Sequence, residues 1–226
     1  MDQANIKPFK RVLVANRGEI AIRVYRALNE LGITTVGIYS KEDKYALFRA
    51  KADESYPLNP EKGPTDAYLD IKGIIAIAKE AKVDAIHPGY GFLSENPEFV
   101  EACEENGIVF IGPSKELMQA MGDKISSKQM AIKAEVPIIP GVDHALDTEE
   151  EVMEVAEMVG YPVMLKASNG GGGRGMRIVN CAEDMPMAYR EACDESKKAF
   201  GDDQIFVEKY LRGPKHIEVQ VVADNY

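Results

Sequence analysis

The stretch VMLKASNGGGGRGMRIV, residues 163–179, decides what the second half of the chain can be. Its four consecutive glycines, residues 170–173, carry no Cβ and can adopt positive φ, so their backbone N–H groups can wrap an anion such as phosphate. The apolar runs on either side, residues 163–166 and 176–179, predict two strands. The glycines are therefore expected to join two strands as a flap that closes over a nucleoside triphosphate and excludes water.

The residues beside the glycines exclude the commoner phosphate-binding loops. A Walker-type loop needs Gly-Lys-Ser/Thr at the start of a helix, and a dinucleotide fingerprint needs a strand before it and a helix after it. Neither pattern occurs here. The remaining alternative is a glycine-rich hairpin tip or a flexible linker, although linkers rarely separate two apolar strands.

Composition limits the class of protein. A chain of 226 residues with 45% hydrophobic and 28% charged residues is typical of one or two globular domains. The net charge of −10 argues against nucleic-acid binding, which needs a basic face, and favours a small-molecule partner. Three cysteines without metal-type spacing are interpreted as reduced thiols. No apolar run reaches the length of a membrane span and no signal peptide is recognised, so we expect a cytoplasmic protein without a membrane partner.

The first part of the chain predicts a parallel α/β layer. Short buried strands are expected at residues 11–15, 34–39, 85–87 and 109–111, with helices at 20–31, 71–81 and 97–105. This strand–helix–strand order is typical of a Rossmann-like parallel sheet. The first turn lacks the glycine triplet of a dinucleotide-binding site, so NAD is not assigned there.

The second part predicts a smaller α+β unit. Two linking helices, residues 115–122 and 124–134, lead to a boundary that places the first domain at 1–136 and a lid at 137–211. The lid is expected to begin with a helix capped by Asp147 or Thr148, because Glu151 completes a capping box with Thr148. A second helix is expected near 183–199 and a last strand at 205–211.

The end of the chain predicts one further strand. Residues 216–222 alternate polar and apolar side chains, which is typical of a hairpin arm. Such an arm would leave backbone groups unpaired, so residues 212–226 are expected to be the truncated start of another domain in a longer protein.

Four motifs in this order carry a resemblance to a known family. They are the glycine run, VANRGEIA at residues 14–21, HPGYGFLSEN at 87–96 and EKYL at 208–211. With them the whole chain resembles the biotin carboxylase component of biotin-dependent carboxylases. The segments YSKEDK (39–44) and KADESY (51–56) are more similar to pyruvate carboxylases than to acetyl-CoA or propionyl-CoA carboxylases.

The resemblance implies an ATP-grasp fold in which a Rossmann-like domain is followed by a small lid. The implied reaction is the ATP-driven carboxylation of biotin by bicarbonate through carboxyphosphate, with magnesium as cofactor. The implied partners are a biotinyl carrier domain and a carboxyltransferase domain that passes the carboxyl group to pyruvate. A flap fits this chemistry because carboxyphosphate must be protected from water.

The resemblance also implies the residues of the ATP site. Lys124 and Lys166 would neutralise the phosphates as point charges, and Gly172 and Gly173 would supply the nearest amides. Met176 would pack against adenine, although core packing is the default for methionine. Without the resemblance, Lys124 is more simply an exposed lysine at the start of a helix.

The remaining implied contacts lie on strand ends and loops. Glu208, Lys209 and Leu211 resemble an adenine-binding strand end, where a carboxylate or backbone carbonyl accepts the exocyclic amine. His216 resembles a histidine beside the sugar, or is a polar residue on the wet face of a strand. The implied biotin contacts, Tyr90 and Gly91, could equally belong to simple turn chemistry.

Two arginines also resemble family positions, and one asparagine differs from the family. Arg23 and Arg26 resemble the contact of a homo-oligomer, or simply face solvent. Asn169 stands where the family has glycine or serine-glycine, and asparagine accepts left-handed geometry better than most residues. The family's magnesium ligands and bicarbonate-binding residues would follow residue 226, so the 226-residue chain is expected to hold no metal ligand and to be inactive alone.

Three other interpretations remain open. Another ATP-grasp ligase would share the flap but not the other three motifs. A non-catalytic dimerisation or nucleotide-binding module would bind partners without turnover. A dehydrogenase is the most distant alternative, and it is excluded if NADH does not bind.

Overall fold

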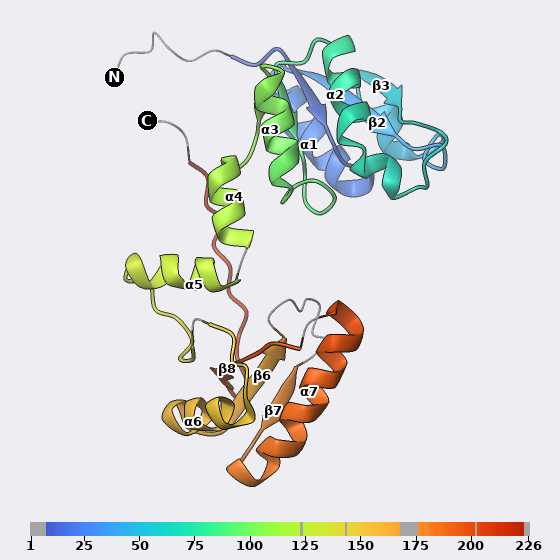
Figure 1. Cartoon of the computed structure of the whole chain (residues 1–226). Coiled ribbons are helices and arrows are strands. Elements are labelled where there is room, and N and C mark those ends of the chain that lie inside the picture. The colour runs from blue at the N-terminus through green and yellow to red at the C-terminus, as the bar shows by residue number, and fades with distance from the viewer. Residues whose placement is uncertain (1–7, 123, 143, 168–175, 202, 224–226) are drawn as a thin grey trace. The chain divides into compact units, whose positions relative to one another are not determined.

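The computed structural model describes residues 8–122, 124–142, 144–167, 176–201 and 203–223, with the backbone alone at 124, 125, 199 and 200. The chain divides into two compact units, Met1–Asp123 and Lys124–Tyr226, and each is described by itself (Figure 1). Helix α5 (Lys124–Lys133) therefore belongs to the second unit, whereas the sequence-based boundary at residue 136 had grouped it with the first. The reason is local, because Lys128 in α5 donates to the carbonyl of Val142 and Gly141 forms a bridge to Glu208.

The first unit is built on a five-stranded parallel sheet (Figure 1). The strands are ordered β3 (Glu54–Pro57), β2 (Thr34–Tyr39), β1 (Arg11–Val14), β4 (Ala85–His87) and β5 (Val109–Phe110). The chain runs outward from β1 through β2 and β3 and then returns to β4 on the other side. The carboxyl ends of β1 and β4 therefore meet at the point where strand order reverses, the usual ligand-binding place of such sheets.

Helices cover both faces of this sheet. The helices of the first unit are α1 (Gly18–Glu30), α2 (Ile71–Glu80), α3 (Pro97–Glu105) and α4 (Lys115–Gly122), with 3₁₀ turns at Leu47–Lys51 and Asp66–Leu69. Along β1, Val12 and Val14 pack in one buried cluster with α1, whereas Leu13 packs in another with α2 and α3. This alternation confirms the Rossmann-like α/β fold expected from the sequence.

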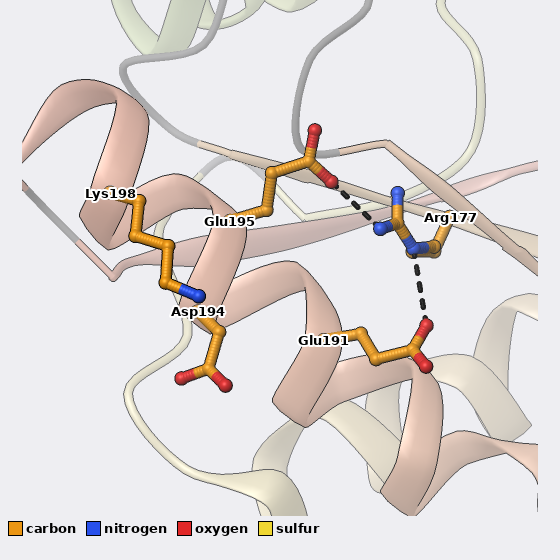
Figure 2. A pocket seen from close by; sticks show the side chains of 5 residues that line it. All are labelled: Arg177, Glu191, Asp194, Glu195 and Lys198. Carbon is orange, nitrogen blue, oxygen red and sulfur yellow. Dashed lines mark hydrogen bonds and ion pairs between the residues drawn. The ribbon is translucent and has the colours of Figure 1, made fainter.

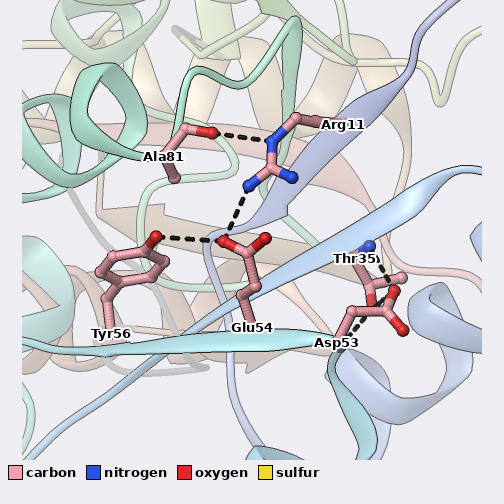
Figure 3. A network of polar contacts seen from close by, with 6 residues as sticks. All are labelled: Arg11, Thr35, Asp53, Glu54, Tyr56 and Ala81. Atoms are coloured by element: carbon pink, nitrogen blue, oxygen red, sulfur yellow. Dashed lines mark hydrogen bonds and ion pairs between the residues drawn. The ribbon is translucent and has the colours of Figure 1, made fainter.

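The edge strand β3, which the sequence analysis did not predict, is held by polar side chains (Figure 3). Arg11 donates to Glu54 at 2.7 Å and to the carbonyl of Ala81 at 2.8 Å, and Tyr56 donates to Glu54 at 3.0 Å. The hydrogen bond from Arg11 lowers the pKa of Glu54. Arg11, the partner of Glu54, is 43 positions away in the chain, so no local sequence pattern indicates strand β3.

The second unit is built on a three-stranded antiparallel sheet. Its strands are ordered β7 (Arg177–Val179), β6 (Val163–Ala167) and β8 (Ile205–Lys209), and its helices are α5, α6 (Glu149–Val159) and α7 (Met185–Phe200) after a 3₁₀ turn at Ala182–Asp184. Buried side chains from alternate positions of the strands, such as Leu165 and Val207, form one core with residues of α6 and α7. The two strands expected beside the glycine run are thus present and adjacent, while residues 168–175 lie outside the described part.

Helix α6 begins where the capping box predicts. Thr148 is its N-cap and accepts a hydrogen bond from the N–H of Glu151 at 3.2 Å. The carboxylate of Glu151 accepts from the N–H of Asp147 at 3.0 Å, so two N–H groups at the start of the helix are satisfied. In the usual capping box the Glu side chain accepts from the N–H of the N-cap residue itself. Here Glu151 accepts from the N–H of Asp147, the residue before the N-cap.

The strand expected at residues 216–222 is not formed. Within the described part of this segment, up to residue 223, no residue belongs to a strand, and Ile217, Val219 and Val221 are at least 77% exposed. Alternation predicts which side chains would share a face, but a strand also needs a neighbour for its backbone groups. The described residues offer this segment none.

Candidate nucleotide site

The sheet of the second unit has one half-buried face that carries both charged and apolar side chains. The register pairs Lys166 with Phe206 and Met164 with Glu208, and side chains diagonal to each other on one face can meet. Lys166 and Glu208 do so, because Nζ of Lys166 lies 2.6 Å from Oε2 of Glu208. The sequence analysis had placed them at opposite ends of a nucleotide, and the structure joins them in an ion pair.

A third charged side chain reaches the same carboxylate. Nζ of Lys128, on α5, lies 3.8 Å from Oε1 of Glu208 and donates to the carbonyl of Val142 at 2.9 Å. The side chains of Lys128 and Glu208 are only 12% and 15% exposed. Two ammonium groups around one carboxylate leave a local excess of positive charge in a largely desolvated place, which favours binding of an anion.

Apolar side chains accompany these charges. Met164 and Phe206 are half-buried on the same face of the sheet, and Nζ of Lys166 lies 5.9 Å from the centre of the Phe206 ring. Met176 and Ile178, at β7, are 38% and 47% exposed. A charged cluster bordered by flat apolar surface suits a ligand with an anionic part and an aromatic part.

The other residues of the predicted ATP site are placed less directly. Gly172, Gly173 and the side chain of Lys124 lie outside the described residues. Leu211 is 45% exposed, and Nε2 of the exposed His216 lies 2.8 Å from Oε1 of Glu218. The structure thus brings Lys166 and Glu208 together, but among the described residues no hydrogen bond or ion pair joins Leu211 or His216 to them.

The side chain of Lys209 has a structural partner. Its Nζ donates to the carbonyls of Gly160 at 2.6 Å and Tyr161 at 3.0 Å, directly after helix α6. Its backbone N–H donates to the carbonyl of Pro140 at 2.8 Å. An adenine contact from this residue would therefore come from its backbone carbonyl.

Lys128 is the charged residue that the sequence analysis missed. It lies in a helix with many exposed positions, and Met130 and Ile132 beside it are 37% and 49% exposed. One lysine among several in such a helix gives no signal of its own. The only available indication would have been its distance of four residues, about one helical turn, from Lys124.

The first unit presents the expected loop at the carboxyl ends of β1 and β4. Nδ2 of the buried Asn16 donates to the carbonyls of Pro88 and Tyr90, both at 2.8 Å, which holds the loop after β4. Tyr90 is 66% exposed, and Gly91 adopts a φ of 68°. Tyr90 and Gly91 therefore lie where a ligand of this sheet would bind, on a loop whose shape is fixed from below.

An ion pair borders this loop at the end of β1. Arg17 donates to both carboxylate oxygens of Asp43, at 2.6 Å from Nε and 2.5 Å from Nη2, and Tyr68 donates to Asp43 at 2.7 Å. The hydrogen bond from Arg17 lowers the pKa of the buried Asp43 carboxyl, and that from Tyr68 acts in the same direction. Arg23 and Arg26, the candidate oligomer contacts, are exposed on α1.

A hollow between β7 and α7 is lined almost wholly by charge (Figure 2). Arg177 lies 2.7 Å from Glu195 and 3.4 Å from Glu191, and Asp194 and Lys198 complete the lining. These pairs connect the helix to the strand, and none of Lys128, Lys166 and Glu208 contributes to the lining. The hollow is therefore distinct from the candidate nucleotide site.

Neither a metal centre nor a membrane span is found in the part of the chain that the structure describes. No group of three or more His, Cys, Asp or Glu side chains there is arranged to hold a metal ion. No helix among them is long and apolar enough to cross a membrane.

Two family models match successive parts of the chain. The model of the biotin carboxylase N-terminal domain matches residues 8–118, and that of the carbamoyl-phosphate synthase L chain ATP-binding domain matches residues 123–226. Pyruvate carboxylase of Bacillus subtilis (strain 168) is 56% identical over 225 residues, which are 100% of this chain and 19% of that protein. The chain thus spans about a fifth of the length of this relative.

Solved structures give the same result. The Campylobacter jejuni biotin carboxylase, in complex with β,γ-ATP, has a TM-score of 0.81 and 48% identity, covering 92% of this chain and 46% of that one. The biotin carboxylase domain dimer of Hydrogenobacter thermophilus 2-oxoglutarate carboxylase, in complex with MgADP, ADP and bicarbonate, has a TM-score of 0.79 and 48% identity, covering 92% and 45%. The resemblance inferred from the motifs is confirmed, and the chain belongs to the biotin carboxylases, of which it carries the N-terminal domain and part of the ATP-binding domain that follows it.

Proposed function

We propose that this chain provides the nucleotide-binding part of a biotin carboxylase that carboxylates biotin with ATP and bicarbonate, as one step of pyruvate carboxylase. The single observation that supports it most is the Lys128–Glu208–Lys166 cluster on the half-buried face of the three-stranded sheet. Two strands of that sheet, β6 and β7, flank the glycine run. The solved relatives that hold a nucleotide or bicarbonate support the choice of ligands.

In this proposal the charged residues divide the nucleotide between them. Lys124 and Lys166 neutralise the phosphates, and the amides of Gly172 and Gly173 contact them from the flap. Glu208, the backbone of Lys209 and Leu211 recognise the adenine edge. Met176 packs on the adenine ring, and His216 lies beside the sugar.

Binding of ATP then requires Lys166 to change partners. Its ammonium group lies 2.6 Å from Glu208, and a triphosphate offers more negative charge than one carboxylate. When Lys166 turns to the phosphates, Glu208 is free to accept a hydrogen bond from the exocyclic amine. The flap excludes water while carboxyphosphate forms from bicarbonate and the γ-phosphate and transfers its carboxyl group to biotin beside Tyr90 and Gly91.

The rest of the enzyme lies with other domains. Magnesium is the expected cofactor, and we assign it no ligand among the described residues. We propose a biotinyl carrier domain, a carboxyltransferase domain and a homo-oligomer as partners, with Arg23 and Arg26 at the oligomer contact. The free thiols Cys103, Cys181 and Cys193 support a reducing compartment, for which we propose the cytoplasm.

Substitution in the full-length protein that contains this chain tests the proposal. Lys166→Ala and Glu208→Ala should each lower bicarbonate-dependent ADP release with free biotin by about 100-fold or more, because each removes a charged side chain that is proposed to contact ATP. Lys198→Ala, in the separate hollow of Figure 2, is the matched control and should keep the activity.

This assay, together with measurements of nucleotide binding, oligomeric state and acceptor turnover, separates the alternatives. Activity that survives both site substitutions would contradict the proposal, and dimerisation without nucleotide binding would favour an assembly module. Turnover of acetyl-CoA, propionyl-CoA or 2-oxoglutarate in place of pyruvate would change the acceptor but keep the biotin carboxylase step. The 226-residue chain alone should release no ADP, and bicarbonate-dependent release by it would contradict that part.

A further inference from the structure

The position of Lys128 raises a question that the proposed function does not answer. If Lys166 turns to the phosphates, Glu208 loses its nearest cation, although its side chain is only 15% exposed. An ionised carboxylate in such a place is costly without a partner, so it would turn toward another donor or toward water. A Glu208 that turned away would leave the exocyclic amine of adenine without an acceptor.

Lys128 is held where it can prevent this. Its ammonium group contacts the carbonyl of Val142 at 2.9 Å and approaches the carboxylate oxygen that Lys166 does not use, at 3.8 Å. At 12% exposure its side chain is more buried than that of Lys166, at 27%. The ammonium group of Lys128 is therefore less free to move away from Glu208 than that of Lys166.

The segment that anchors Lys128 is itself fixed against β8. Gly141 forms a bridge to Glu208, and the N–H of Lys209 donates to Pro140 at 2.8 Å. A Cβ at Gly141 would lie 2.5 Å from the carbonyl oxygen of Val207, so the approach is too close for any other residue. The carbonyl of Val142 is consequently held next to the carboxylate that Lys128 faces.

We propose that Lys128 is a positioning residue for base selection, which keeps the Glu208 carboxylate oriented as an acceptor for the exocyclic amine of adenine after Lys166 has moved to the phosphates. The inference rests on the proposed function and deepens it. In it, Lys166 serves the phosphates, Glu208 reads the base, and Lys128 acts on the base only through Glu208.

The experiment compares ATP with ITP in the full-length protein, since ITP differs in carrying a carbonyl in place of the amine. A Glu208 carboxylate held in place accepts from the amine and repels the carbonyl, whereas one that has turned away does neither. Lys128→Met should therefore lower the ratio of kcat/KM for ATP over ITP by about tenfold, mainly through KM, because a charge-assisted hydrogen bond is lost.

Three further variants keep the test decisive. Lys128→Arg should restore most of the preference, and Lys133→Met, an exposed lysine on the same helix, should leave it unchanged. Lys128→Gln can keep a donor for Val142 without the charge, so it replaces Lys128→Met if that variant does not fold. An unchanged ATP over ITP ratio in a folded Lys128→Gln or Lys128→Met would overturn the inference.

The two proposals fail differently. If Lys166→Ala abolishes activity while Lys128→Met keeps full base preference, the nucleotide site stands and only the role of Lys128 is wrong. If Lys166→Ala and Glu208→Ala have no effect on either nucleotide, the proposed function fails and this inference fails with it.

Discussion

Asn16 fixes the loop after β4 through contacts that a single added methyl group would break. Its amide group donates to two carbonyls of the loop, and Gly89 packs directly on it. A Cβ at Gly89 would lie 2.6 Å from Nδ2 of Asn16, and the φ of 67° is unfavourable for any residue with a side chain. Gly91 has nearly the same φ, 68°, but a Cβ there would meet nothing within 4 Å.

This pair of glycines gives a matched prediction about stability. Gly91→Ala should cost about 1 kcal/mol, the strain of a left-handed alanine. Gly89→Ala should cost about 2–4 kcal/mol, since it adds a clash with a buried hydrogen-bonded amide. Urea unfolding of the chain measures both free energies, and equal losses would show that Asn16 can move away without cost.

At the level of secondary structure, α6 is held at both ends by side chains. Thr148 caps its start, and Lys209 reaches from β8 to the carbonyls of Gly160 and Tyr161 at its end. A cation suits this end because the helix dipole is negative there and the last carbonyls lack helical partners.

Removing either contact should destabilise the second unit. We expect Thr148→Ala to cost about 1 kcal/mol, as N-cap substitutions do, and Thr148→Ser to cost much less. Lys209→Met should cost about 1–2 kcal/mol, because two carbonyls lose a charged donor. In the full-length enzyme Lys209→Met should leave the KM for ATP unchanged, and a large rise in KM would show that the lysine side chain contacts the nucleotide.

The same elements show how far the sequence could lead. Strands such as β2 and β4 are short, largely buried runs without charged residues other than a terminal histidine, so their bounds follow from the pattern alone. Strand β3 is polar and depends on Arg11, a distant partner, while residues 216–222 have the pattern of a strand without a neighbour. A local sequence pattern predicts a helix or strand only where the apolar side chains of that element are themselves buried in the core.

The candidate site follows the same rule. Lys166 and Glu208 could each be picked out from motifs, but their contact depends on the register of β6 against β8. Lys128 could not be found, since its role comes from the fold of residues 140–142 along β8. The chemistry of single residues was predictable, and their partnership was not.

For the whole molecule, the division into two compact units predicts two separable unfolding transitions. Gly89→Ala should lower one transition temperature and Thr148→Ala the other. Calorimetry of the chain checks this. A single transition that both substitutions shift equally would contradict the independence of the units.

Mild acid should lower the stability of the first unit, whose unfolding transition Gly89→Ala identifies. Burial lowers the pKa of His87 from its ordinary value of 6.5, and Nδ1 of His87 accepts a hydrogen bond from the N–H of Gly89 at 3.0 Å. The unfolded chain therefore binds a proton on this histidine before the folded chain does. Stability should be unaffected above pH 6.5 and fall as the pH drops through it, levelling off only below the folded-state pKa.

A substitution separates this effect from other acid-sensitive groups. His87→Asn can keep an acceptor for Gly89 but does not titrate, so the transition that Gly89→Ala identifies should become independent of pH between 7 and 5. Asp43 acts at lower pH, because Arg17 holds its pKa below the ordinary value of 3.8, so its contribution to stability is lost as the pH falls from 3.8 through the lower folded-state pKa. An equal loss of stability between pH 7 and 5 with and without His87 would show that another group governs the acid response.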